Sequence, residues 1–208
     1  MRATKLGAVF LFHPLYAVDI VKRDSRRYAG LPALVLLLSA LLMRTLSLML
    51  CCYTVSGTEW RDVDLPLELF LLTAALGTWV LVNYFMTEIL SGSSTLHEIV
   101  SYTAYALLPY ILTAPLFIAA SWVMSESLMP FYRLAQTAVF VWAGLLLFLG
   151  MMRANDYGFW RAVLVLLILV IAMLLVWALL LLFMTLVSQA VMLVKEVLYE
   201  IDLRGITS

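Results

Sequence analysis

Charged residues are scarce in this sequence, and their scarcity excludes the commonest class of protein. Asp, Glu, Lys and Arg make up 12% of the 208 residues, against about a quarter in an average soluble domain. Hydrophobic residues make up 65%, and the mean hydropathy is +1.04. A soluble globular domain is therefore excluded. Because 13 basic residues balance 13 acidic ones, the charge also gives no reason to expect a nucleic acid partner.

Residues that carry chemistry are equally few. The adjacent Cys51 and Cys52 cannot build a disulfide framework, and two histidines cannot supply a metal cluster alone. His97 and Glu98 begin like the zinc-protease helix motif, but Ser101 stands where the second His should be. Neither a P-loop nor a nucleophile elbow occurs. The sequence therefore predicts no catalytic residue, no metal site and no cofactor.

Long apolar runs are what the sequence does contain. A hydrocarbon core of about 30 Å needs about 20 apolar residues in a helix. Five runs reach that length, at about 31–52, 66–85, 99–124, 133–152 and from 159 onward. We therefore expect an all-α, multi-pass integral membrane bundle with five transmembrane helices in residues 31–187, inside a lipid bilayer.

Two amphipathic segments flank these runs. Within a basic segment, residues 1–30, the stretch Pro14–Arg23 mixes apolar and charged side chains and predicts an interfacial helix. The fifth run has no Gly or Pro from Phe159 to Arg204, which predicts a long helix, and residues 188–208 form its amphipathic C-terminal extension. This extension could project as a continued helix, lie on the membrane or dock on another subunit.

Basic residues indicate the orientation. Six of them precede the first span: Arg2, Lys5, Lys22, Arg23, Arg26 and Arg27. Because short Lys- and Arg-rich segments stay inside, we expect a protein of the cell membrane with a cytoplasmic N-terminus. With five spans, the C-terminal extension then falls outside.

A few polar residues and prolines interrupt the spans. Arg44 would be costly unpaired in lipid, and Glu68, at a similar depth in the second span, is the expected partner. Arg44 could instead snorkel outward or meet another subunit. Pro109 and Pro115 predict a kink or break in the third span, either as a packing feature or as part of a gate or binding site. Glu88, His97 and Glu98 should cluster at the cytoplasmic ends of the second and third spans.

Two stretches resemble a known family. Residues 91–96 read SGSSTL and residues 102–110, which include Tyr102 and Tyr105, read YTAYALLPY. They are similar to the small-residue loop and the Tyr-x-Leu-x-Pro-like stretch of the Yip family, the Ypt/Rab-interacting-protein domain. The N-terminal His13-Pro14-Leu15-Tyr16 looks like the start of bacterial members. One departure is Ser91-Gly92, where many relatives have two glycines.

The resemblance implies five spans and a non-enzymatic role. Bacterial members include some that look like companions of carbohydrate ABC importers, so the leading hypothesis is an accessory or scaffold subunit of a larger membrane assembly. Its partners would be other membrane protein subunits, importer permeases among them. The alternatives are a small transporter or channel, and a GTPase-linked membrane-trafficking adaptor like the eukaryotic members. An intramembrane enzyme would depend on His97 and the serines near it.

Overall fold

The computed structural model describes residues 3–23, 30–52 and 64–206, and every regular element in these ranges is a helix. Five of the helical segments are long and apolar enough to cross a membrane. They are α4 (Leu31–Leu50), α6 (Leu65–Ile89), the α7–α8 pair (Leu96–Ala106 and Leu108–Val123), α9 (Met129–Ala154) and the apolar part of α10 (Phe159–Ile206). The predicted all-α membrane architecture is confirmed, and the predicted spans fall on these helices.

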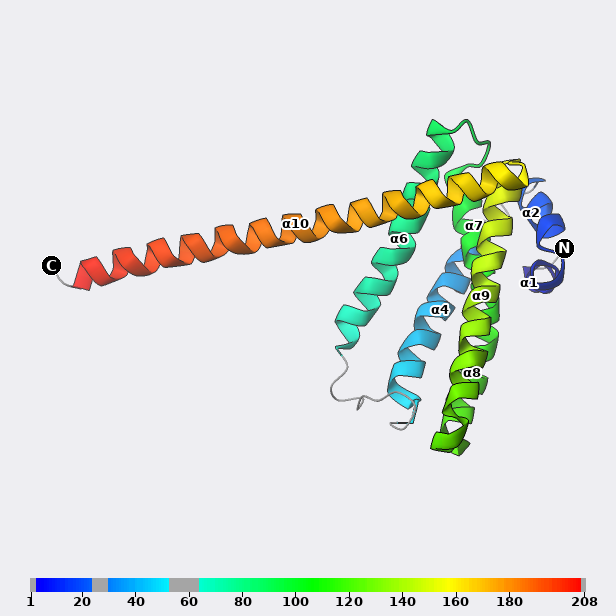
Figure 1. Cartoon of the computed structure of the whole chain (residues 1–208), viewed down its shortest axis with the longest axis horizontal. Helices are drawn as coiled ribbons and strands as arrows, with labels where there is room; N and C mark the ends of the chain where they lie inside the picture. Colours follow the sequence, from blue (N-terminus) through cyan, green and yellow to red (C-terminus); the bar gives the residue numbers. More distant parts are fainter. Residues whose placement is uncertain (1–2, 24–29, 53–63, 207–208) are drawn as a thin grey trace. The chain divides into compact units, whose positions relative to one another are not determined.

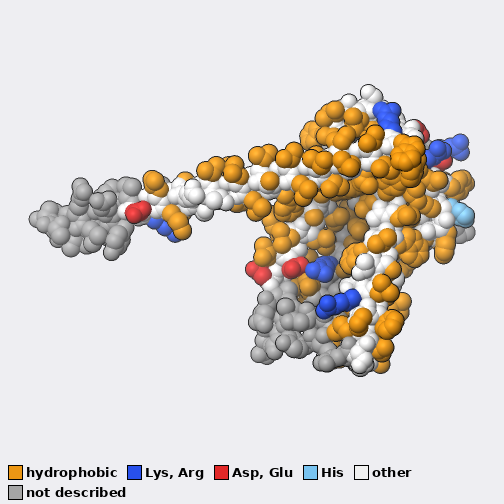
Figure 2. Space-filling view, in the orientation of Figure 1, with side chains coloured by type: hydrophobic (Ala, Val, Ile, Leu, Met, Phe, Trp, Pro, Cys, Tyr) orange, Lys and Arg blue, Asp and Glu red, His pale blue; other side chains and the backbone are white. Residues whose placement is uncertain are grey.

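Exposed apolar side chains cover the bundle helices, as a lipid environment requires. Figure 2 shows hydrophobic side chains over most of the visible face, with the charged ones in small groups. The most exposed include Leu31 at 77%, Leu116 at 69% and Val123 at 88%. In water such a surface would be strongly unfavourable, whereas lipid tails solvate it without cost. The chain is therefore a membrane protein.

A helical hairpin precedes the first span. It consists of α1 (Ala3–Phe12) and α2 (Pro14–Arg23), and its turn closes through the bond from His13 N to Val9 O, 2.7 Å. The sequence predicted α2 at its observed bounds but not α1. Leu6 and Phe10 of α1 and Val18 of α2 are buried, and α2 packs against α7 and α9. The hairpin is thus part of the packed core.

Short contacts join helix ends at one end of the bundle. At one end, Cys52 N donates to Ser121 Oγ over 3.1 Å and Trp122 Nε1 donates to Leu50 O over 2.9 Å, which joins the ends of α4 and α8. We call this the Arg44 end. The opposite end, which holds α2 and the loops at residues 90–95 and 155–158, is the α2 end (Figure 1).

The third span is broken between α7 and α8, as its prolines predicted. α7 ends at Ala106, and α8 begins at Leu108 with Pro109 in its first turn, where a missing N–H is tolerated. Pro115 lies inside α8, which continues to Val123. α7 is buried along most of its length, and Gly150 of α9 comes so close that a Cβ there would lie 2.9 Å from the Tyr102 ring. This short helix is the centre of the bundle.

The chain divides into two compact units, residues 1–167 and 168–208. The boundary falls within α10, which is one continuous helix of 48 residues. The first unit holds the hairpin, the four preceding spans and the start of α10. The second is the remainder of α10, and its described side chains from Leu179 to Val187 are exposed or nearly so.

Candidate functional site

At the α2 end, ion pairs bind the N-terminal hairpin to the bundle. Arg153 at the end of α9 donates two hydrogen bonds, of 2.7 and 2.8 Å, to the two carboxylate oxygens of Asp19 in α2. Lys22 Nζ lies 2.6 Å from Asp156 Oδ2 and 3.1 Å from Ser93 Oγ. Lys22 therefore joins α2 to both loops of this end at once. Such exposed pairs position the hairpin more than they stabilise it.

Beneath these ion pairs, a buried hydrogen-bond group joins the same two loops. Asn155 Oδ1 accepts from Ser94 Oγ over 2.7 Å and from Ser94 N over 3.3 Å, while Asn155 Nδ2 donates to Met151 O over 3.1 Å. Both side chains are buried. The amide thus satisfies a loop donor and a helix-end carbonyl that would otherwise be costly in the interior.

The loop at residues 90–95 has no spare room. A Cβ on Gly92 would lie 2.4 Å from Asn155 Oδ1, 2.6 Å from Tyr157 Oη and 2.7 Å from Thr87 Cγ2. Ser91 beside it has φ 53°, a backbone conformation that glycine adopts more easily than other residues. Close approach between the two loops therefore requires glycine at position 92.

The pKa values of Asp156 and Tyr157, both in the loop at residues 155–158, are shifted from their ordinary values. The hydrogen bond from Lys22 holds the pKa of the Asp156 carboxyl below its usual value, against a smaller opposing effect of burial. Burial raises the pKa of the Tyr157 hydroxyl, which Arg161 partly offsets from 4.7 Å above the ring. Arg161 also donates to Leu90 O over 2.6 Å. The Asp156 shift thus comes from the contact that joins α2 to the loop, and the Tyr157 shift comes from burial of the loop.

Glu88 at the end of α6, and His97 and Glu98 at the start of α7, lie at the α2 end. Glu98 is buried and accepts from Thr95 N over 3.0 Å, so its carboxylate caps the start of α7. Glu88 and His97 are exposed. No group of three potential metal ligands occurs in the described part of the chain. The role visible for Glu98 is helix capping.

The tyrosines of the predicted motif face the bundle interior. Tyr102 Oη accepts from Asn83 Nδ2 over 2.7 Å, and one residue on, Thr103 Oγ1 accepts from Trp79 Nε1 over 3.2 Å. These bonds fix α6 against α7. Tyr105 stacks on Phe10, with ring centroids 5.7 Å apart, and so holds α1 on the opposite side of α7. Both tyrosines connect helices within the first unit.

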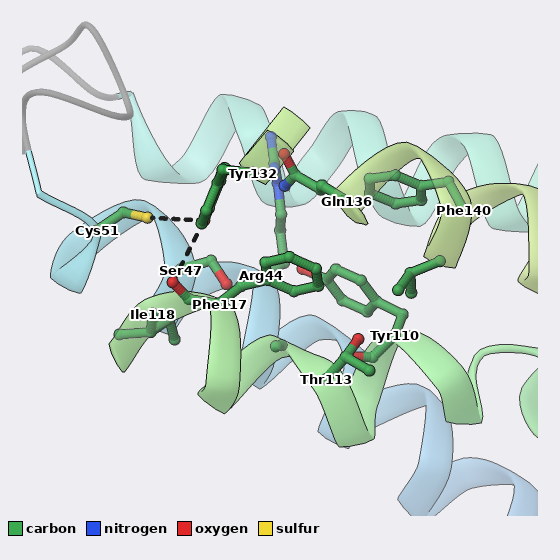
Figure 3. A pocket seen from close by; sticks show the side chains of 12 residues that line it. Arg44, Ser47, Cys51, Tyr110, Thr113, Phe117, Ile118, Tyr132, Gln136 and Phe140 are labelled. Carbon is green, nitrogen blue, oxygen red and sulfur yellow. Dashed lines mark hydrogen bonds between the residues drawn. The ribbon is translucent and has the colours of Figure 1, made fainter. Parts of the chain in front are cut away.

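At the Arg44 end, the structure brings Arg44 and Glu68 together. Arg44 Nη2 lies 3.0 Å from Glu68 Oε2, and the side chains remain 37% and 39% exposed. Arg44 also reaches a small cavity of about 40 Å³ between α4, α8 and α9 (Figure 3). Its polar lining includes Ser47, Tyr132 and Gln136. A cavity of this size holds one or a few water molecules.

Tyr132 closes the small cavity toward the helix ends. Its hydroxyl donates to Phe117 O over 3.3 Å and lies 3.7 Å from Cys51 Sγ, the two contacts dashed in Figure 3. The Phe117 and Tyr132 rings meet edge to face at 5.3 Å. These contacts hold α8, α9 and the end of α4 together around the cavity.

Sequence reasoning missed most of the α2-end network. Asn155 and Asp156 lie in a four-residue connection whose only local sign is an Asn-Asp pair between two long apolar runs, which indicates a turn and nothing more. In the sequence, Lys22 is one of the six basic residues that indicate orientation. Its partners are 71 and 134 residues away in sequence, so no local pattern could have identified them.

Comparison with known proteins adds no relative: no family model, curated protein or solved structure matches the chain.

Proposed function

We propose that this chain is a non-enzymatic accessory or scaffold subunit that assembles with another membrane protein through α10. The polar residues at the α2 end support a structural role, because their contacts cap helices, close loops or join α2 to the bundle. The observation that carries the proposal is the length of the apolar part of α10.

That length exceeds what a bilayer can cover. The apolar segment Phe159–Leu193 has 35 residues, about 52 Å of helix at 1.5 Å per residue. A hydrocarbon core of about 30 Å accommodates about 39 Å of helix at a tilt of 40°, the upper end of observed tilts. At least about 13 Å of apolar helix therefore lies beyond the hydrocarbon.

The excess segment is suited to a protein partner. Exposed apolar side chains continue past the length of one span, among them Val187 at 42%, Met192 at 71% and Leu193 at 64%. Burying such side chains is favourable by about 25 cal/mol per Å² of apolar surface. α10 has no Pro, and its first Gly is Gly205, so it lacks the usual causes of a sharp bend onto the membrane surface. A helix or groove of another membrane protein supplies the missing contacts.

Which protein the partner is depends on the resemblance to the Yip family. That resemblance implies the permease of a carbohydrate ABC importer as one partner and a small GTPase as another. Of these we favour a membrane subunit, because the excess of α10 is apolar. We further propose a cell membrane location with a cytoplasmic N-terminus, on the basic residues before α4. Membrane-impermeant labelling of a cysteine placed at the exposed Arg23 in intact cells tests the orientation.

Site-specific photocrosslinking in native membranes tests the partner. A crosslinker at Met192 should capture one membrane protein in a defined adduct. The matched control is a crosslinker at Leu134 of α9, whose exposure of 68% equals that of Met192 within a few per cent. Leu134 should give lipid adducts or none. The doubly substituted Val187→Ser, Leu193→Ser chain should lose the partner on purification while Gln189→Ser retains it.

Three results would overturn this function. The first is an adduct of Met192 with lipid alone, and the second is an adduct only with another copy of this chain. The third is that crosslinkers at Met192 and Leu134 capture the same set of proteins, because that would mean that both positions meet membrane proteins by random collision.

A small transporter is the second candidate, favoured by the break between α7 and α8 and the cavities around Arg44. Flux measured in proteoliposomes that contain only this chain tests it, and the absence of flux for ions and small sugars counts against it.

A further inference from the structure

A lateral cleft of about 360 Å³ opens between α4, α6, α9 and the start of α8 at the Arg44 end. All of it lies within the first unit. Its walls are apolar, with Leu71, Leu72 and Leu76 from α6 and Phe140 from α9, except for Tyr110 and one ion pair, Arg44 with Glu68. A cleft of this kind on a membrane protein is open to lipid.

The ion pair at the cleft is incompletely satisfied by its own contact. The bond between Arg44 Nη2 and Glu68 Oε2 uses one N–H of a guanidinium that carries five, and one of two carboxylate oxygens. Both side chains keep more than a third of their surface exposed, 37% and 39%. Charges exposed toward hydrocarbon are unfavourable, so groups of opposite sign are expected over both of them.

Both charged residues lie within two turns of a helix end, so their long side chains can reach toward the headgroups. Glu68 is the fourth residue of α6, about 5 Å from its start, and Arg44 is about 9 Å from the end of α4. Leu76 lies eight residues beyond Glu68, about 12 Å deeper along α6. The cleft therefore has its charged groups toward the helix ends, within reach of a headgroup, and its apolar interior toward the middle of the helices.

We propose that this cleft binds one phospholipid with a zwitterionic headgroup that carries a primary ammonium, of the phosphatidylethanolamine type. Arg44 faces the phosphate, Glu68 accepts from the ammonium, and an acyl chain lies along Leu72 and Leu76. The small cavity on the other side of Arg44, with Ser47 and Gln136 in its wall, provides room for the water that hydrates the guanidinium.

Charge complementarity selects this headgroup over the other common ones. An anionic headgroup without an ammonium would put its phosphate beside the Glu68 carboxylate with nothing to compensate that negative charge. A choline headgroup has the right charges, but its quaternary ammonium has no N–H to donate to Glu68. Of the common headgroups without net charge, ethanolamine offers both a phosphate to Arg44 and a charged N–H donor to Glu68.

Native mass spectrometry of the full chain, released from detergent and titrated with lipids of identical acyl chains, tests the site. Phosphatidylethanolamine should bind at one site at least tenfold tighter than phosphatidylglycerol and severalfold tighter than phosphatidylcholine. Arg44→Gln and Glu68→Gln should each weaken phosphatidylethanolamine at least tenfold. Leu72→Trp, which fills the apolar interior and leaves both charges in place, should do the same.

Arg133→Gln is the matched control, because it removes one exposed positive charge near the start of α9 and lines neither cavity. It should bind phosphatidylethanolamine as the unaltered chain does. Thermal unfolding in detergent identifies any variant that fails to fold, and if Arg44→Gln does, Glu68→Gln and Leu72→Trp decide the question.

The proposal fails if the three lipids bind equally, or if phosphatidylglycerol binds tightest. It fails equally if Leu72→Trp leaves binding unchanged, since the acyl chain then lies elsewhere, or if Arg133→Gln weakens binding as much as Arg44→Gln, since the lipids then respond only to net charge. None of these outcomes depends on a protein partner at α10, so the site and the proposed function are tested separately.

Discussion

The α2 end joins α2 and two loops by hydrogen bonds of 2.6–3.3 Å, and a Cβ on its Gly92 would overlap three neighbours. At the Arg44 end, by contrast, the polar side chains line two cavities, of about 40 and 360 Å³, and the central ion pair is more than a third exposed. The two ends use the same kinds of residue. Where polar side chains join loops and helices within the chain, as at the α2 end, the region is structural, and where cavities remain beside them, as at the Arg44 end, there is room for a ligand.

The largest expected effect is steric and belongs to the α2 end. Gly92→Val should destabilise the protein by about 3 kcal/mol, because the added atoms meet Asn155, Tyr157 and Thr87 and overpack a filled site. Thermal unfolding in detergent measures the change. Gly144→Ala in α9, whose Cβ would meet nothing within 4 Å, should leave stability within about 0.5 kcal/mol. Equal effects at the two glycines would show that the α2 end is not tightly packed.

A smaller effect is expected from the buried amide. Asn155→Leu keeps the volume but leaves Ser94 N and Oγ without their acceptor, at a cost of about 2 kcal/mol in the free energy of unfolding. Gln136→Leu makes the same chemical change beside the small cavity of the Arg44 end, where water can hydrate the neighbouring polar groups. Denaturant titration should show a smaller loss in the free energy of unfolding for Gln136→Leu than for Asn155→Leu. A larger loss for Gln136→Leu would contradict the contrast between the two ends.

At the Arg44 end, Arg44→Leu should cost about 1 kcal/mol, less than a fully buried pair would, because both partners are partly exposed. The double variant Arg44→Leu, Glu68→Leu should recover part of that loss, since it leaves no unpaired charge. Protein level in the membrane and unfolding temperature check both. An unchanged level and temperature in Arg44→Leu would mean that the pair has no structural role.

The smallest effect is a dependence on pH at the α2 end. Lys22 lowers the pKa of Asp156 in the folded protein, so the pair contributes stability above pH 4 that is lost as the pH falls through the lowered pKa. Because Asp156 is 61% exposed, the contribution should be a few tenths of a kcal/mol. Unfolding temperatures at pH 7 and pH 3 measure it. Asp156→Asn should narrow the difference between the two temperatures, and an unaltered difference would assign the dependence to other carboxylates.

Local sequence patterns predicted much of the fold because hydrophobic length and proline act locally. The run at Leu31–Leu50, the break before Pro109 and the absence of Gly and Pro after Phe159 each follow from a few adjacent residues. α1 was missed because ten residues are too short for a span and lack a clear amphipathic pattern. Its burial depends on the contact of Phe10 with Tyr105, which no local rule contains.

The candidate sites also include one part that the sequence predicts and other parts that only the tertiary structure shows. Arg44 and Glu68 could be paired from the sequence, because an unpaired charge in lipid is costly and helix length gives its depth. The lateral cleft beside that pair could not, because its volume depends on how far α6 stands from α9. The contacts of Lys22 with Ser93 and Asp156 were equally beyond reach, since they join three segments separated by 63 to 134 residues.

The sequence by itself determined that this is a helical membrane protein with five spans, because burial of apolar length in lipid is set by composition and needs no knowledge of the fold. The tertiary structure alone decided which polar groups form hydrogen bonds or ion pairs within the chain and which line a cavity. That distinction depends on distances of a few ångströms between segments far apart in sequence, as between Gly92 and Asn155 at one end and Cys51 and Tyr132 at the other.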